Sequence, residues 1–145
     1  MKPYGEIQVY DSIKEIADVF MDHGLNFQFQ IDGERMSLSL AYGQENYTAE
    51  LHFLVNEDDN RVRVRSNGIA RVPPARVDAV LSLFSKLNNE IGLVSFYLNS
   101  TLDIIISYDT PNVKEGIGSL CYEIFCWYFA VLDQTYPRIM KTIWA

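Results

Sequence analysis

Hydrophobic residues near the start of the chain recur at intervals of three and four positions, which is the period of one helix face. The residues that follow this period are Ile13, Ile16, Ala17 and Phe20. Ser12 and Glu15 have the spacing of a capping box at the start of a helix, and Gly24 can end a helix in the left-handed conformation. We therefore predict a first helix over residues 12–24.

From residue 27 onward the period changes to two, which is typical of strands with one buried face. Apolar side chains alternate with polar ones in four consecutive runs, at residues 27–31, 36–42, 49–55 and 61–65. A polar segment that contains Glu57, Asp58 and Asp59 separates the third run from the fourth and has the composition of a hairpin turn. The four runs predict an antiparallel meander.

A second helix is predicted after Pro73 and Pro74, because proline is tolerated in the first turn of a helix. Its expected apolar stripe consists of Val77, Val80, Leu81, Phe84 and Leu87. Two further alternating runs, at residues 94–98 and 102–106, flank a short polar turn and predict a second hairpin.

A last helix is expected after Pro111. Pro137 lacks an amide hydrogen, so we expect it to kink or interrupt this helix and to leave residues 138–144 as a short terminal piece. Five aromatic side chains of the helix point in several directions, because successive residues turn by about 100°. They are Tyr122, Phe125, Trp127, Tyr128 and Phe129. Two interpretations stay open: a core helix covered on several sides, or a helix whose second face forms a symmetric dimer contact.

The predicted order of elements is helix, four strands, helix, two strands and helix, within one domain that covers residues 1–145. A chain of this length is typical of a single domain. We expect an α+β fold of two layers, in which an antiparallel sheet carries its helices mainly on one face.

The net charge narrows the range of partners. With 19 acidic and 12 basic side chains the formal charge is −7, which disfavours nucleic acids and anionic lipid surfaces. The apolar stretch at residues 117–132 is shorter than the roughly 20 residues that span a bilayer, and the N-terminus has no apolar run typical of a signal peptide. We therefore expect a cytoplasmic protein without a membrane anchor.

The sequence has no motif typical of an enzyme, a metal site or a cofactor site. Its two histidines, His23 and His52, lack the spacing of a zinc site, and we expect His52 to form a solvated pair with Glu50. The acidic turn lacks the glycine and the distant glutamate of a calcium loop, and no nucleophile elbow or phosphate-binding glycine loop is present. Cys121 and Cys126 are expected to be buried thiols. We expect no enzymatic activity, no metal and no cofactor.

Five of the seven arginines lie within sixteen residues that contain no acid: Arg61, Arg63, Arg65, Arg71 and Arg76. The planar guanidinium group suits carboxylates, so Arg61, Arg63 and Arg65 are candidate residues for docking an acidic peptide. The alternative is that these arginines are the solvated side of a strand, paired with Glu50.

Two segments resemble the bacterial YbjN-like family, which is described as a family of regulators of sensory transduction. The first, VPPARVDAVLSLFSKLNNEIG, joins the meander to the central helix at residues 72–92, and the second, DQTYPRIMKTIWA, occupies residues 133–145. With the strands before the first segment, the resemblance covers most of the chain from about residue 12. It implies one YbjN-like domain whose fold is similar to the chaperones of type III secretion, which bind polypeptides, are often dimeric and perform no chemistry.

These observations lead us to expect a non-enzymatic, dimeric module that binds a protein or peptide in a regulatory or chaperone-like role. The contact would use the sheet face or the arginines. The alternative is a regulatory domain that senses a small ligand in an apolar pocket between sheet and helices. A third hypothesis, a hydrolase built on paired carboxylates, needs a cleft that separates their pKa values.

Overall fold

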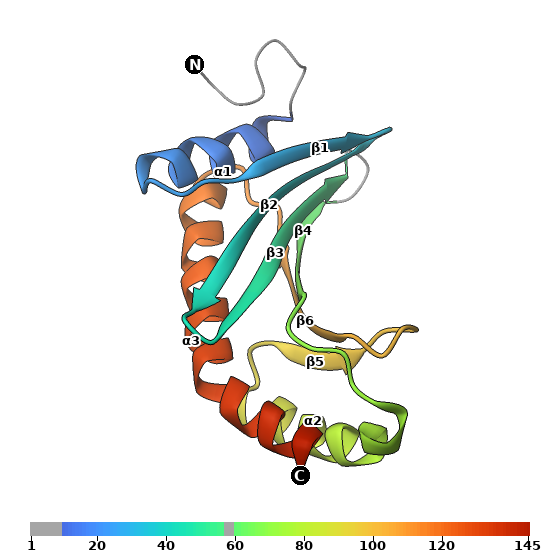
Figure 1. The fold of residues 1–145 in the computed structure, drawn as a ribbon. Coiled ribbons are helices and arrows are strands. Elements are labelled where there is room, and N and C mark those ends of the chain that lie inside the picture. The colour runs from blue at the N-terminus through green and yellow to red at the C-terminus, as the bar shows by residue number, and fades with distance from the viewer. Residues whose placement is uncertain (1–9, 57–59) are drawn as a thin grey trace.

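The computed structural model describes residues 10–56 and 60–145 (Figure 1). The first half of the chain forms helix α1 (Asp11–Asp22) and strands β1 (Gln28–Asp32), β2 (Arg35–Gln44), β3 (Tyr47–Asn56) and β4 (Arg61–Asn67). The second half forms a 3-10 turn (Pro74–Arg76), helix α2 (Val77–Ile91), strands β5 (Ser95–Leu98) and β6 (Ile104–Pro111), and helix α3 (Ile117–Trp144). This is the predicted order. The acids Glu57, Asp58 and Asp59 of the predicted turn lie outside the described residues.

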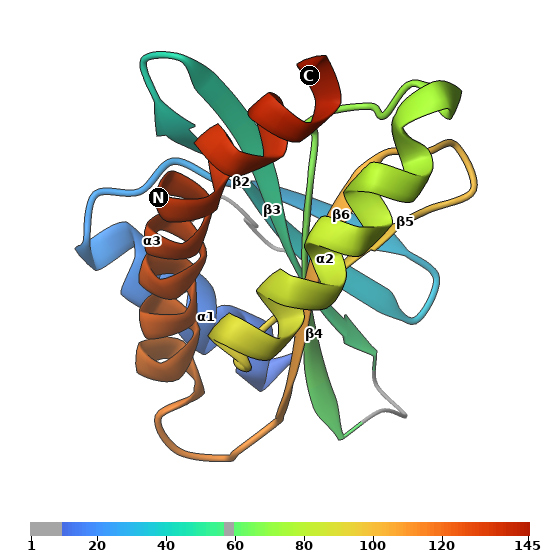
Figure 2. The ribbon, with the colours of Figure 1, turned by 90° about the horizontal axis from the view of Figure 1, so that it is seen from below.

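The six strands form one antiparallel sheet in the order β1-β2-β3-β4-β6-β5. β1 to β4 form the predicted meander, and β6 pairs with β4, which attaches the second hairpin to the same sheet. The three helices lie on one side of the sheet (Figure 2). Along β3 the side chains that face the helices are buried, and they alternate with exposed or half-buried ones. The α+β fold with helices on one face of an antiparallel sheet is confirmed.

The end of α1 follows the prediction. The N–H of Gly24 donates to the carbonyl of Met21 at 2.9 Å, and the N–H of Leu25 donates to the carbonyl of Phe20 at 3.0 Å. Gly24 has a φ of +72°, which a residue without a Cβ atom adopts with little strain. The glycine therefore ends the helix and turns the chain toward β1.

The start of α1 differs from the prediction. The helix begins at Asp11, before Ser12, and no side chain of a described residue caps it. The carboxylate of Glu15 instead accepts a hydrogen bond of 2.6 Å from the backbone N–H of Gly118, in the first turn of α3. The first amides of a helix have no partner within the helix and attract negative charge. Glu15 therefore caps α3 rather than α1.

α2 faces the core through the residues Val80, Leu83, Phe84 and Leu87. The predicted stripe included Leu81, which is 47% exposed. Each residue turns the helix by about 100°, so Leu81 points away from the buried face and Leu83 points into it. At the C-terminal end of α2 the side chain of Asn88 accepts a hydrogen bond of 2.7 Å from the N–H of Phe96. This bond ties α2 to β5.

α3 runs without interruption from Ile117 to Trp144 and contains Pro137. Its axis changes direction in the C-terminal part (Figure 1), which agrees with the predicted kink, because proline leaves a carbonyl of the preceding turn without its donor. Residues 138–144 do not form the separate piece that was predicted. Arg76 donates hydrogen bonds of 3.0 and 2.7 Å to the carbonyl of Thr142 and so ties the end of α3 to the start of α2. None of the helices in the described ranges is long and apolar enough to cross a membrane.

Two tyrosines of the β2–β3 hairpin place their hydroxyl groups in buried positions. The hydroxyl of Tyr42 forms a hydrogen bond of 2.6 Å with that of Ser66, and burial raises the pKa of Tyr42. The hydroxyl of Tyr47 is also buried, but it has no hydrogen-bond partner among the described residues. The ring of Tyr47 stacks on that of Tyr136, with centroids 4.4 Å apart. The two tyrosines therefore differ in whether the hydroxyl group has a hydrogen-bond partner.

Tyr47→Phe is expected to leave the free energy of unfolding within about 0.5 kcal/mol of the wild-type value or to raise it, because no hydrogen bond is lost. Tyr42→Phe is expected to lower it by about 1–2 kcal/mol, because the buried hydroxyl of Ser66 loses its partner. Both variants keep the aromatic ring, so urea denaturation isolates the hydroxyl groups. A larger loss for Tyr47→Phe than for Tyr42→Phe would contradict this assignment.

Candidate binding surface on the open face of the sheet

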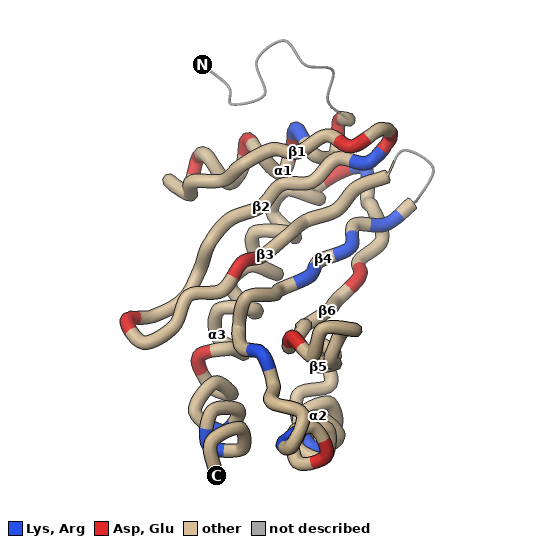
Figure 3. The backbone as a smooth tube through the Cα atoms, turned by 45° about the vertical axis from the view of Figure 1, so that its right-hand side comes forward, with Lys and Arg blue, Asp and Glu red and all other residues tan. Residues whose placement is uncertain are grey.

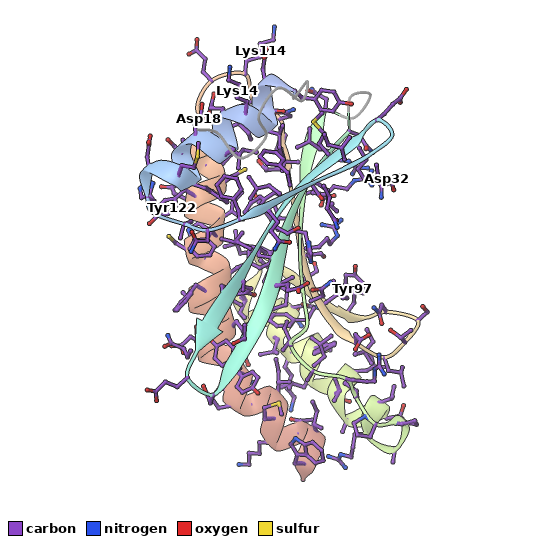
Figure 4. The ribbon with its side chains drawn as sticks, turned by 45° about the horizontal axis from the view of Figure 1, so that its top comes forward. Lys14, Asp18, Asp32, Tyr97, Lys114 and Tyr122 are labelled. Carbon is purple, nitrogen blue, oxygen red and sulfur yellow. The ribbon has the colours of Figure 1, made fainter. Side chains whose placement is uncertain are left out.

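The side of the sheet opposite the three helices, which we call the open face, carries mostly polar side chains. Register places alternate residues of neighbouring strands in rows across it. One row consists of Gln28, Ser39, His52, Arg65, Ser107 and Ser95. The next row consists of Gln30, Ser37, Leu54, Arg63 and Asp109. Asp32 at the end of β1 and Tyr97 on β5 mark the two edge strands (Figure 4).

Three arginines, Arg61, Arg63 and Arg65, follow one another along β4 (Figure 3). They lie on the open face, and we call them the arginine row, which runs along one strand and not across the sheet. Arg65 Nη1 donates to a carboxylate oxygen of Asp109 on β6 at 2.6 Å, and Arg61 Nη1 lies 3.4 Å from the other oxygen. Arg63 is directly opposite Asp109 in the strand register. In the described part of the chain Arg61 and Arg65 therefore share Asp109, and the predicted pairing of these arginines with Glu50 is not found there.

The other two arginines of the predicted segment do not join this row. Arg71 pairs with Asp103 at 3.3 Å, and hydrogen bonds from Thr101 and Arg71 lower the pKa of Asp103. Arg76 binds the carbonyl of Thr142 at the end of α3. Arg71 and Arg76 thus have contacts separate from those of the arginine row, because β4 ends at Asn67, before these two residues.

The contact between Arg65 and Asp109 shows how the open face can hold a carboxylate. The two side chains are 27% and 32% exposed, and a charged hydrogen bond is stronger in such a half-buried site than in open solvent. Arg65 Nη1 also donates to the carbonyl of Val64 at 3.0 Å, which fixes the guanidinium group. Because a guanidinium group has five N–H donors, donors remain for a carboxylate that arrives from solution.

A groove of about 500 Å³ lies over β2, beside the arginine row. Its floor contains the small residues Ser39 and Ala41. One wall consists of the amide side chains of Asn26, Gln28 and Gln30, and the other of Glu50 and His52 on β3. The groove was not among the features predicted from the sequence. The small residues on the polar side of β2 are a pattern from which a depression in this face could have been predicted.

His52 connects the groove to the neighbouring strands. Its Nδ1 atom lies 2.7 Å from the hydroxyl of Ser39, and its Nε2 atom lies 3.3 Å from Oδ1 of Asn67 and 3.4 Å from Glu50 Oε2. The Glu50 side chain is 64% exposed, so the predicted solvated pair of His52 and Glu50 is confirmed. The imidazole therefore has a hydrogen-bonding group at each ring nitrogen, which holds the plane of the ring.

A serine beside a histidine is also the arrangement of a nucleophile and its base. Ser39 and His52 lie in the middle of β2 and β3, where the backbone N–H groups serve the antiparallel ladder. Acyl transfer requires N–H donors directed at the developing oxyanion, and ladder amides point along the sheet rather than into the groove. The geometry favours binding over nucleophilic attack. In the described ranges no cluster of three or more His, Cys, Asp or Glu side chains could hold a metal ion.

The five aromatic residues of α3 pack within their own chain. Tyr128 is fully buried, and Tyr122, Phe125, Trp127 and Phe129 are half-buried against the core. Tyr122, where α3 passes α1 (Figure 4), stacks on the imidazole of His23 with ring centroids 3.7 Å apart. These contacts agree with a core helix covered on several sides. Four of the five rings keep part of their surface exposed, and the dimer contact stays a prediction.

The two cysteines differ in environment. Cys121 is buried, and burial raises the pKa of its thiol, so a reactive thiolate is disfavoured. Cys126 is exposed, and the prediction that both thiols are buried is wrong for this residue. Five positions of a helix turn it by about 500°, which places Cys126 about 140° around the axis from Cys121 and toward solvent.

No protein-family model matches the sequence, and no curated protein is similar enough to it to count as a match. The arginine row and the groove of the open face are therefore the features that bear on function.

Proposed function

We propose that the protein is a binding module for segments of other proteins, that it performs no reaction, and that its open face is the contact surface. The observation that carries the proposal is the arginine row, which already holds the carboxylate of Asp109 between Arg61 and Arg65. A partner that presents acidic side chains would meet the same donors. We place this activity in the bacterial cytoplasm, in a regulatory or chaperone-like role.

The interior supports a surface contact more than a ligand pocket in the core. Phe20, Phe53 and Tyr128 are fully buried between the sheet and the helices, and the ring of Phe20 contacts that of Phe53 with centroids 5.3 Å apart. Aromatic side chains in mutual contact fill the layer in which a small apolar ligand would have to lie. The groove on the open face, by contrast, is accessible, and its lining combines polar side chains with the apolar residues Phe27 and Leu40.

The proposed module is a homodimer, and the half-buried aromatic side chains of α3 are one candidate contact. The large apolar side chains that are exposed lie on several elements, and they include Ile31, Leu81, Tyr97 and Trp144. Single exposed apolar residues are common on monomers. Light scattering after size-exclusion chromatography determines the mass, and a monomer at tens of micromolar would remove the dimer without affecting the open face.

Arg63→Glu is expected to weaken binding of acidic peptides by about tenfold or more, because it replaces an attractive charge with a repulsive one in the centre of the row. The probe is a displayed library of random 12-residue peptides, selected on the immobilised wild-type protein. Enriched peptides are then measured in solution by fluorescence anisotropy against each variant. Circular dichroism and thermal unfolding confirm that each variant is folded.

Two matched variants show whether the position of the charge matters. Arg71→Glu makes the same change of charge outside the row and is expected to leave binding within about twofold, as expected for a surface charge away from the contact. Asp109→Asn removes the internal carboxylate and is expected to strengthen binding severalfold, because Arg61 and Arg65 lose their competitor. If no peptide is enriched, or if Arg63→Glu binds like the wild type, the proposal fails.

A further inference from the structure

The groove over β2 has walls whose polar groups recur at every second residue. On the β1 side, Gln28 and Gln30 are exposed and two positions apart in one strand. On the β3 side, Glu50 and His52 are also two positions apart and line the same groove. Positions separated by two residues in a strand are about 6.7 Å apart. The β1 wall therefore offers two hydrogen-bonding side chains at the repeat distance of an extended chain, and Glu50 offers a carboxylate on the other wall.

An extended peptide has the polar pattern that these walls require. The N–H and C=O groups of one residue point to the same edge of the chain, and those of the next residue point to the opposite edge. A glutamine amide carries both a donor and an acceptor, so Gln28 and Gln30 can each bind the N–H and C=O of one peptide residue. On the opposite wall, the Glu50 carboxylate can accept a peptide N–H. The His52 ring bounds the groove there, and its two nitrogens already face Ser39 and Asn67.

The floor of the groove sets its depth and its length. Ser39 and Ala41 are small, so a peptide can lie between the walls with alternate side chains directed toward the floor. Ser37, the next small residue on this side of β2, is only 7% exposed, because Gln30 and Leu54 flank it in the register. The groove therefore closes at Ser37. The distance along β2 from Ser37 to Ala41 is about 13 Å, which suits roughly four extended residues.

We propose that this groove binds the backbone of an extended peptide of about four residues, and that Gln28, Gln30 and Glu50 are the residues whose side chains bind it. The inference rests on the proposed function and assigns the peptide's position on the open face. Recognition of the backbone tolerates many sequences, whereas the arginine row, one strand beyond the β3 wall, favours peptides with acidic side chains next to the bound segment. The groove supplies affinity for an extended chain, and the arginine row supplies the preference for acidic side chains.

The experiment uses peptides enriched on the full-length wild-type protein from the random 12-residue library. Ala41→Trp fills the groove at an exposed strand position, where an aromatic residue is compatible with the sheet, and is expected to weaken binding at least about tenfold. Ser95→Trp makes a comparable change on the open face of β5, outside the groove, and is expected to leave the affinity within about twofold. Thermal unfolding confirms that both variants are folded.

An N-methyl scan of one enriched peptide tests recognition of the backbone directly. Methylation of single backbone nitrogens is expected to weaken binding to the wild type severalfold at alternate residues of a four-residue stretch. The double variant Gln28→Ala, Gln30→Ala is expected to be insensitive to methylation at the positions that face the β1 wall. If binding depends on Arg63 but not on Ala41→Trp or on backbone methylation, the proposed function stands and the groove assignment is wrong. If the library yields no binder, both fail.

Discussion

Tyr128→Ala is expected to lower the free energy of unfolding by about 3–5 kcal/mol, the range for removal of a large buried aromatic side chain. Tyr128 is fully buried in α3. Its hydroxyl donates a hydrogen bond of 2.8 Å to the carbonyl of Val64 on β4 and lies 3.4 Å from the carbonyl of Ile106 on β6. One side chain therefore joins the longest helix to two strands in the centre of the sheet.

Tyr128→Phe separates the ring from the hydroxyl group. Its expected loss is only about 1 kcal/mol, because the carbonyl of Val64 still accepts a hydrogen bond from Arg65 at 3.0 Å. Urea denaturation gives the free energy of unfolding of both variants. The slope of this free energy against urea concentration is expected to equal that of the wild type. If Tyr128→Ala lost less than about 2 kcal/mol, the ring would not be the central contact between α3 and the sheet.

Gly118→Ala is expected to lower the free energy of unfolding by about 2 kcal/mol, as the net result of two opposing effects. An added Cβ atom would lie 2.6 Å from Cγ2 of Val19 and 2.7 Å from the backbone oxygen of Glu15. Since that oxygen belongs to α1, the helix itself would have to move, which costs about 3 kcal/mol, the upper end of the usual range for over-packing. The higher helix propensity of alanine returns about 1 kcal/mol.

Ser119→Ala, at the next position of α3, is the control for Gly118→Ala. Ser119 is exposed, so its replacement is expected to change stability by no more than about 0.5 kcal/mol. Equal stabilities of Gly118→Ala and the wild type would show that α1 and α3 are farther apart than the structure has them. A variant at Glu15 is less informative, because its carboxylate both caps α3 and lies near the crossing point.

The sequence predicts most of the fold because its hydrophobic periods are long and regular. The alternating run from Met36 to Tyr42 and the one from Ala49 to Val55 each identify a strand and its buried face, and the structure has both. The predictions are wrong where a contact between distant parts of the chain selects one of several local arrangements that the sequence allows equally. Glu15 has the spacing to cap its own helix, but the first turn of α3 lies within its reach and receives the carboxylate.

The candidate site was predictable only in part. Arg61, Arg63 and Arg65 alternate along one strand, so their common surface follows from the period of two. Asp109 could not be assigned as their partner, because nothing local shows that β6 pairs with β4. The groove depends on side-chain sizes on three neighbouring strands, and register across strands is a property of the folded sheet.

The bond between Glu15 and Gly118 joins residues that are 103 positions apart, and this separation has a consequence for synthesis. α1 is synthesised well before its packing partner α3. Until α3 has been made, the apolar side of α1 and the helix-facing side of the meander lack part of their cover. The nascent chain thus exposes aggregation-prone surface over this interval, and complete closure of the core must follow the synthesis of α3.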